Sequence, residues 1–277
     1  MADFMMKPLK IFLIVISSLA IVIIAYLALL TFRVHPTQAA GSHYVSQTCA
    51  SAPLPCYLTI QEAIDAAAEG DVIQIASGVY STVNNYGGQT QIAYISKTIT
   101  IQGGYAAGFS EPPDPEANRT ILDAEGNGRG LYITGEISPT IAGVSITGGN
   151  AIDGGGIYVI TAAAHLKDNW VYNNTSTSFG GGLYVIGGAI IEASSITTNT
   201  ASSGGGGILV AAGGVLPNLG VAQLRKNVVA GNSACYGAGL DLAFSTAVIT
   251  ANKISNNSAT YCGYDGSGIG GGVLIDQ

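Results

Sequence analysis

Hydrophobic residues recur at nearly regular intervals along the second half of the sequence. Each recurrence is a glycine-rich triplet followed by alternating apolar and other residues, and the first apolar positions are Leu131, Ile157, Leu183, Ile208, Leu240 and Val273. Their separations of 26, 26, 25, 32 and 33 residues describe a unit of 25 or 26 residues with two insertions. Such a period is typical of a solenoid, in which each unit buries its apolar face against the next.

Short strands explain the pattern within each unit better than helices do. Segments such as Ile157-Tyr158-Val159 alternate with period two, and Gly and Asn interrupt them after a few residues. Two further apolar columns recur at spacings of 25, 33 and 25, namely Leu166, Ile191, Leu224 and Ile249, and Val171, Ile196, Val229 and Ile254. The sequence therefore predicts an all-β chain whose short strands pair in parallel with the units on either side, at about 4.8 Å.

Polar columns share the spacing of the apolar ones. One contains Asn174, Asn199, Asn232 and Asn257, and the other contains Asn169, Ser194, Asn227 and Asn252. Asn tolerates a left-handed backbone at bends and can donate its amide to the equivalent residue one unit along. We expect a structural asparagine ladder, and we interpret the sequons at Asn118, Asn173, Asn174 and Asn256 as turn residues first, with glycosylation as the alternative.

The first forty residues form a separate segment. Residues 11–32 are almost entirely apolar and, as a helix, would span about 33 Å, enough for a bilayer core of about 30 Å. Lys7 and Lys10 precede this stretch and Arg33 alone follows it, which predicts export of everything downstream. Residues 37–40 resemble a cleavage site, so residues 1–40 are either a signal peptide or a retained transmembrane signal-anchor. The chain is then secreted, or membrane-anchored at the cell surface.

Composition excludes several other classes of protein. The chain is 48% hydrophobic and only 10% charged, the reverse of a disordered protein. Ten Lys and Arg against 17 Asp and Glu give a net charge of −7, so the chain has no basic footprint for nucleic acid.

Export predicts that the four cysteines form disulfides. Cys49 and Cys56 lie seven residues apart, and Cys235 and Cys262 lie 27 apart after equivalent Asn bends, so we expect these two pairs, with four unpaired thiols as the alternative. We expect no metal site, because no cysteine pair has the Cys-x-x-Cys spacing. Only two histidines, His43 and His165, lie in the part of the chain that is predicted to be exported.

Two motifs carry a resemblance to known proteins. The triple glycine with Ile or Leu, followed by an apolar-x-x-Asn segment such as Val171 to Asn174, resembles the repeat of chlamydial polymorphic outer-membrane proteins. Residues 56–80 look like the opening of pectin-lyase-like proteins. The resemblance implies a right-handed parallel β-helix in which a short helix caps the first coil. Residues 44–130 would be the cap and first coils, and residues 131–277 the repeats.

The predicted capping helix agrees with the local pattern. Ile60, Ala63, Ile64 and Ala67 form one apolar face at helical spacing, and Thr59 with Glu62 is a capping pair.

Enzyme chemistry is not evident in the sequence. The acids of the repeats are scattered over different phases of the unit, so we expect no catalytic residues and no cofactor. The densest polar set, Asp123, Glu125 and Arg129, is interpreted as a solvated turn. The superfamily contains lyases, hydrolases and adhesins, so a polysaccharide lyase or glycoside hydrolase stays open as the alternative.

Two outward columns are candidates for surface function. The residues after the strand markers are Tyr132, Tyr158, Tyr184, Leu209, Asp241 and Leu274, and the three tyrosines would either bind sugar rings or stack on one another. The column Lys167, Glu192, Arg225 and Thr250 is expected to be a structural ladder of ion pairs, and His165 a surface position.

These observations favour an exported surface protein that presents a flat face to glycans or other cell-envelope components, with an envelope spacer as a third alternative. The extra residues near 213–220 and 261–268 are expected to form surface loops. The last strand begins a unit that the sequence does not complete. We therefore expect either a longer parent protein or an end that docks on another chain.

Overall fold

The computed structural model describes residues 40–212, 220–259 and 268–276. The chain divides into two units, Met1–Ala39 and Ala40–Gln277, of which the first lies outside the described residues together with the predicted apolar span. In the described ranges no helix is long and apolar enough to cross a bilayer.

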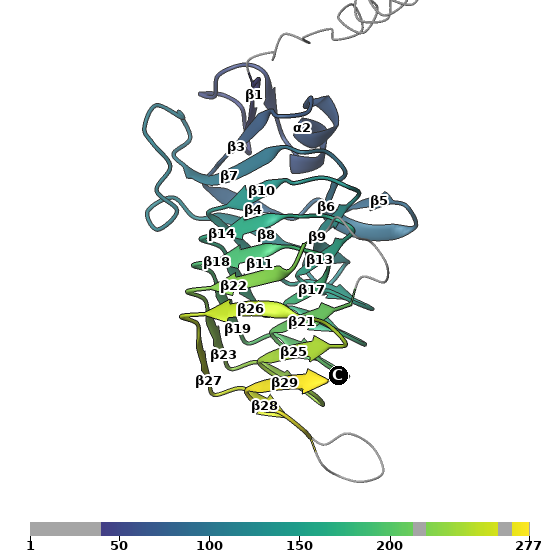
Figure 1. The fold of residues 1–277 in the computed structure, drawn as a ribbon. Coiled ribbons are helices and arrows are strands. Elements are labelled where there is room, and N and C mark those ends of the chain that lie inside the picture. The colour runs from purple at the N-terminus through teal and green to yellow at the C-terminus, as the bar shows by residue number, and fades with distance from the viewer. Residues whose placement is uncertain (1–39, 213–219, 260–267, 277) are drawn as a thin grey trace, which may run out of the picture. The chain divides into compact units, whose positions relative to one another are not determined.

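Four sheets, which we name A to D, make up the described part (Figure 1). Sheet A has nine strands, in the order β2 (Cys56–Tyr57), β1 (Ser42–Val45), β3 (Val72–Ala76), β7 (Thr100–Tyr105), β10 (Thr140–Ala142), β14 (His165–Lys167), β18 (Ile190–Glu192), β22 (Ala222–Arg225) and β26 (Ala247–Thr250). Sheet B has seven, in the order β27 (Lys253–Ser255), β23 (Val228–Ala230), β19 (Ser195–Thr197), β15 (Trp170–Tyr172), β11 (Val144–Thr147), β8 (Thr120–Asp123) and β4 (Gly78–Tyr80).

The other two sheets complete each repeat. Sheet C has eight strands, in the order β29 (Val273–Asp276), β25 (Leu240–Ala243), β21 (Ile208–Ala211), β17 (Leu183–Ile186), β13 (Ile157–Ile160), β9 (Arg129–Thr134), β6 (Gln89–Ile95) and β5 (Asn84–Tyr86). Sheet D has five, in the order β12 (Asn150–Ala151), β16 (Thr175–Ser176), β20 (Thr200–Ala201), β24 (Ser233–Ala234) and β28 (Ser258–Ala259).

From β9 onward, successive strands of the chain enter different sheets, and each pass adds one strand to each sheet. From β13 the chain visits sheets C, A, B and D and returns to sheet C at β17. Neighbouring strands pair in parallel, except for the antiparallel hairpin of β5 and β6. The all-β class and the parallel pairing are therefore confirmed.

The predicted register is confirmed as well. In sheet C, Leu131 pairs with Ile157, Ile157 with Leu183 and Leu183 with Ile208. These residues are at most 1% exposed, because the alternate residues of each strand point into the interior that the sheets enclose.

One short helix closes the amino-terminal end of this interior. Helix α2 (Ile60–Ala66) starts at Thr59, whose side chain accepts from the Glu62 amide while Glu62 accepts from the Thr59 amide. Ile60, Ala63 and Ile64 are buried, as the apolar face predicted. The helix packs on β6 and β1 and covers apolar side chains that would otherwise face water.

Asparagine side chains connect the bends between sheets B and D. Asn174 Nδ2 donates to Asn199 Oδ1 at 3.0 Å, Asn199 Nδ2 to Asn232 Oδ1 at 3.1 Å, and Asn232 Nδ2 to Asn257 Oδ1 at 2.9 Å. The expected left-handed backbone lies one residue earlier, at Asn173 (φ 53°) and its equivalents. The ladder residue keeps ordinary φ because its side chain must point inward, and Asn174 is therefore a buried sequon, 1% exposed.

Of the predicted disulfides, Cys49–Cys56 is present, with a Cα–Cα distance of 5.8 Å. Cys235 is disulfide-bonded, and its predicted partner Cys262 lies outside the described residues. Both sequence insertions also fall mainly outside them, at residues 213–219 and 260–267.

Candidate functional site

The outer face of sheet C carries the tyrosines singled out from the sequence. Strands β9, β13 and β17 place Tyr132, Tyr158 and Tyr184 in register, each next to a buried residue on either side. The alternation of a strand therefore directs all three side chains outward, where they are half-buried.

Glycines just before β13 and β17 make room for two of these side chains, Tyr158 and Tyr184. Gly180 has φ 65°, and a Cβ at this position would lie 2.7 Å from the Cβ of Tyr184. The same relation holds between Gly154 and Tyr158, at 2.9 Å. The recurring triplet thus has a local role that its sequence pattern did not reveal.

The tyrosine rings stack on one another. The centroids of Tyr132 and Tyr158 are 5.4 Å apart with planes 12° from parallel, and those of Tyr158 and Tyr184 are 5.1 Å apart at 14°. Near-parallel rings at this distance cover each other's faces, so ring edges and hydroxyl groups are what the three tyrosines present to solvent.

Three more aromatic residues extend the row, and sequence reasoning missed them. Tyr94 on β6 pairs in register with Tyr132, and its ring meets that of Tyr132 edge-on at 5.5 Å. Tyr86 on β5 stacks on Tyr94, and Phe179 lies 6.3 Å from Tyr184 at the other end. Tyr86 and Phe179 are the exposed ends, at 37% and 39%. We call these six residues the aromatic row.

Beyond Tyr184 the next two residues of the outward column are covered, contrary to expectation. Leu209 and Asp241 continue the register but are only 2% and 5% exposed. Their side chains lie against glycines 204, 205 and 237, where no Cβ keeps them away from the backbone.

A buried arginine lies beneath the row. Arg129 was interpreted as part of a solvated turn, but it is 2% exposed. Its Nε and Nη2 donate to the carbonyl oxygens of Asp153 and Gly154, and its guanidinium carbon lies 5.3 and 5.1 Å from the ring centroids of Tyr132 and Tyr158. The later repeats have glycine or alanine at the position equivalent to 129, so the sequence columns could not indicate where this side chain goes.

Two phenols of the row, Tyr158 and Tyr184, have raised pKa values and are protonated near neutral pH. Burial, with smaller contributions from Tyr184 and Asp153, raises the pKa of Tyr158 to about 12, and burial also raises the pKa of Tyr184. Within the described part of the chain the hydroxyls of Tyr94, Tyr132, Tyr158 and Tyr184 make no hydrogen bond. Each can therefore both donate to a ligand and accept from it.

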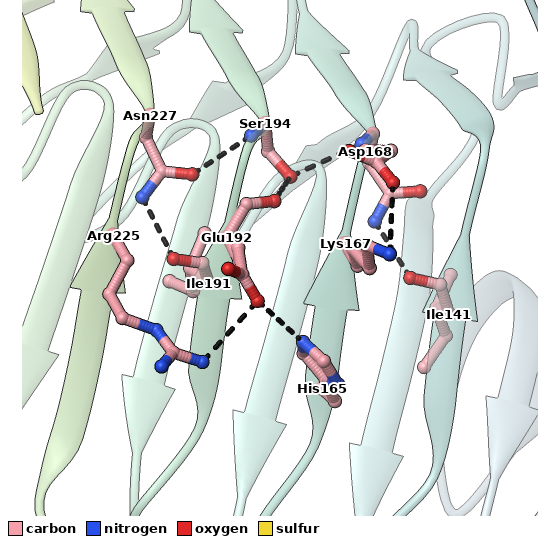
Figure 2. A network of polar contacts seen from close by, with 10 residues as sticks. Ile141, His165, Lys167, Asp168, Ile191, Glu192, Ser194, Arg225 and Asn227 are labelled. Atoms are coloured by element: carbon pink, nitrogen blue, oxygen red, sulfur yellow. Dashed lines mark hydrogen bonds and ion pairs between the residues drawn. The ribbon is translucent and has the colours of Figure 1, made fainter.

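A second polar cluster lies on the outer face of sheet A (Figure 2). Glu192 Oε2 lies 3.3 Å from Arg225 Nη2 and 3.4 Å from His165 Nε2, whereas Lys167 pairs with Asp168 at 3.6 Å. Lys167, Glu192 and Arg225 are aligned in register, as predicted, although Lys167 bonds along the chain rather than across it. These groups are 23–49% exposed, so their attraction is largely screened by water.

No group of three or more His, Cys, Asp and Glu side chains that could hold a metal ion occurs within residues 40–212, 220–259 and 268–276. Comparison with family models, with curated proteins and with solved structures finds no match to this chain.

Proposed function

We propose that this protein is an exported, surface-displayed right-handed parallel β-helix that binds a carbohydrate chain along the aromatic row. The proposal rests on the four phenol hydroxyls of Tyr94, Tyr132, Tyr158 and Tyr184, which make no hydrogen bond to any described residue. The ring centroids of consecutive tyrosines from Tyr94 to Tyr184 lie 5.1–5.5 Å apart, so the four phenols follow successive strands of sheet C at a short interval, with Tyr94 edge-on to Tyr132. An extended polysaccharide also presents hydroxyl groups at regular intervals, and each can exchange hydrogen bonds with a phenol.

The exposed ends of the row add apolar contacts. Tyr94 and Tyr184 are separated by three strand spacings, or about 14 Å, and Tyr86 and Phe179 contact them at the two ends. A ligand that lay along the hydroxyls could therefore stack sugar rings on both ends. The proposed display at the surface is supported by the apolar residues 11–32 and the lysines before them. If this segment is retained, it would also be the link to the membrane.

The stacking itself favours a second candidate, an envelope spacer. Aromatic pairs of this geometry contribute about 0.5–1.5 kcal/mol each beyond their buried area, so the row also stabilises neighbouring repeats. In the glycan-binding candidate the tyrosine hydroxyls bond a ligand, whereas in the spacer candidate only the stacking of the rings contributes.

A variant that replaces Tyr132, Tyr158 and Tyr184 by Phe keeps the stack and removes the three hydroxyls. For the full chain in detergent, we expect a glycan array to identify an oligosaccharide and titration to show about a hundredfold weaker binding by the variant, with an unchanged melting temperature. Tyr172→Phe, a half-buried tyrosine of sheet B, is the matched control and should bind like the wild type.

Equal binding by the triple variant, or no glycan bound at all, would overturn the hydroxyl-row proposal and leave the spacer. The lyase or hydrolase alternative is tested by incubating the protein with the oligosaccharide that it binds. New reducing ends would indicate cleavage, and unsaturated products would indicate a lyase.

A further inference from the structure

The amino-terminal pair of the aromatic row differs chemically from the rest. The Tyr86 hydroxyl donates to Asp65 Oδ2 on α2 at 2.9 Å. The Tyr86 ring is 37% exposed, and it stacks on the half-buried ring of Tyr94 at 5.3 Å with the planes 9° from parallel. An accessible phenol thus has a proton acceptor on one side and a second phenol against its face.

This geometry favours loss of an electron from Tyr86. The hydrogen bond and the charge of Asp65, with some burial, raise the pKa of Tyr86, so the phenol stays protonated in neutral solution. A protonated phenol gives up an electron most readily when its proton moves at the same time to a base within hydrogen-bond reach. Asp65 is such a base.

We propose that Tyr86 is a site of one-electron oxidation and that it couples to Tyr94 as a dityrosine cross-link. The oxidant is hydrogen peroxide acting through a haem peroxidase, which takes one electron from each phenol as each loses its hydroxyl proton. The two phenoxyl radicals join through their ortho carbons, and the two ortho hydrogens leave as the hydroxyls are restored. Two tyrosines and one peroxide thus give one dityrosine and two waters.

Two features confine the reaction to this end of the row. The rings of Tyr94 and Tyr132 meet edge-on, at 69°, so the parallel stack is interrupted after Tyr94. The guanidinium of Arg129 lies close to both Tyr132 and Tyr158, and a nearby positive charge opposes removal of an electron. The triplet Tyr132, Tyr158 and Tyr184 has similar stacking distances but no hydrogen-bonded carboxylate.

The product would tie β5 to β6, the two strands of the hairpin at the edge of sheet C. Strand β5 is the edge strand of that sheet and pairs with a single neighbour, β6. A covalent bond between Tyr86 and Tyr94 would hold this edge in place.

The test treats the full chain in detergent with a haem peroxidase and hydrogen peroxide, and maps dityrosine by its fluorescence and by mass spectrometry of peptides. We expect an intramolecular link between Tyr86 and Tyr94. Asp65→Asn keeps an acceptor for Gln61 and a similar shape but removes the base, and it should slow cross-linking about tenfold. Tyr94→Phe keeps the stack and should abolish the link.

Tyr236 is the matched control, because it is 38% exposed and no carboxylate among the described residues bonds its hydroxyl. Any of four results would overturn the proposal. The first two are oxidation of Tyr236 at the same rate as Tyr86, and a link among Tyr132, Tyr158 and Tyr184 instead. The other two are links only between separate copies of the chain, and an unchanged rate of cross-linking in Asp65→Asn. Glycan binding is not part of this readout, so the two proposals fail independently.

Discussion

Asn199 illustrates what a single side chain contributes to this fold. Its Nδ2 donates to the Val171 carbonyl at 2.9 Å and to Asn232, and its Oδ1 accepts from both the backbone and the side-chain nitrogen of Asn174 at 3.0 Å. The side chain is 0% exposed. Water therefore cannot replace any of these bonds if the amide is lost.

Asn199→Leu should lower the free energy of unfolding by on the order of 3 kcal/mol or more, because it leaves several buried polar groups without partners. Denaturant unfolding followed by the fluorescence of Trp170, the single tryptophan, measures the change. Asn150→Leu is the control, since Asn150 is exposed in sheet D; equal losses in both variants would contradict the ladder argument.

Asp71 predicts a pH dependence. Burial alone would raise its pKa, but hydrogen bonds from the Ala68 amide, from His43 and from the Gly41 amide outweigh burial and lower the pKa from 3.8. A lowered folded pKa means that the carboxylate's stabilisation is present above pH 3.8 and is lost as the pH falls through the folded value. Asp71→Asn should therefore be less stable than wild type at neutral pH, and the difference should shrink in acid.

Unfolding at a series of pH values, followed by Trp170 fluorescence, checks the Asp71 prediction. Glu111→Gln, an exposed carboxylate, should leave the profile unchanged. A constant difference between Asp71→Asn and wild type down to acid pH would show that the carboxylate's charge is not the cause.

At the scale of elements, the turns into β13, β17, β21, β25 and β29 of sheet C each contain a glycine with positive φ. Gly180→Ala places a side chain at φ 65°, where its Cβ would also meet the Leu183 carbonyl and the Tyr184 Cβ. We expect a loss on the order of 3 kcal/mol from backbone strain and overpacking together. Gly108→Ala is the control, because the nearest atom to its Cβ would be 4.0 Å away; thermal unfolding of both should separate them clearly.

At the scale of the whole molecule, most strand pairs join residues about one repeat apart. The partners of β17, for instance, are β13 and β21, 26 and 25 residues away in the sequence. The outer faces of the sheets differ chemically. The aromatic row lies on sheet C, and the charged cluster lies on sheet A (Figure 2). A chain with net charge −7 thus places an arginine, a lysine and a histidine together on sheet A.

The sequence by itself determined the strand columns, their parallel register, helix α2 and the Cys49–Cys56 disulfide. These features follow from short-range spacing and from repetition, because equivalent residues of consecutive repeats must stack if each is to bury its apolar face. Even the inward and outward sides of Leu183 and Tyr184 follow from alternation alone.

Only the tertiary structure decided how the outer side chains are arranged. Alternation points Tyr158 outward but does not say that its ring lies parallel to its neighbours, and the same register buries Leu209 against glycine backbone. Arg129 and Tyr86 lie where the sequence does not repeat, so no column indicated their positions. Their contacts with Tyr132 and with Asp65 depend on rotamers and on packing between distant segments, which local pattern does not encode.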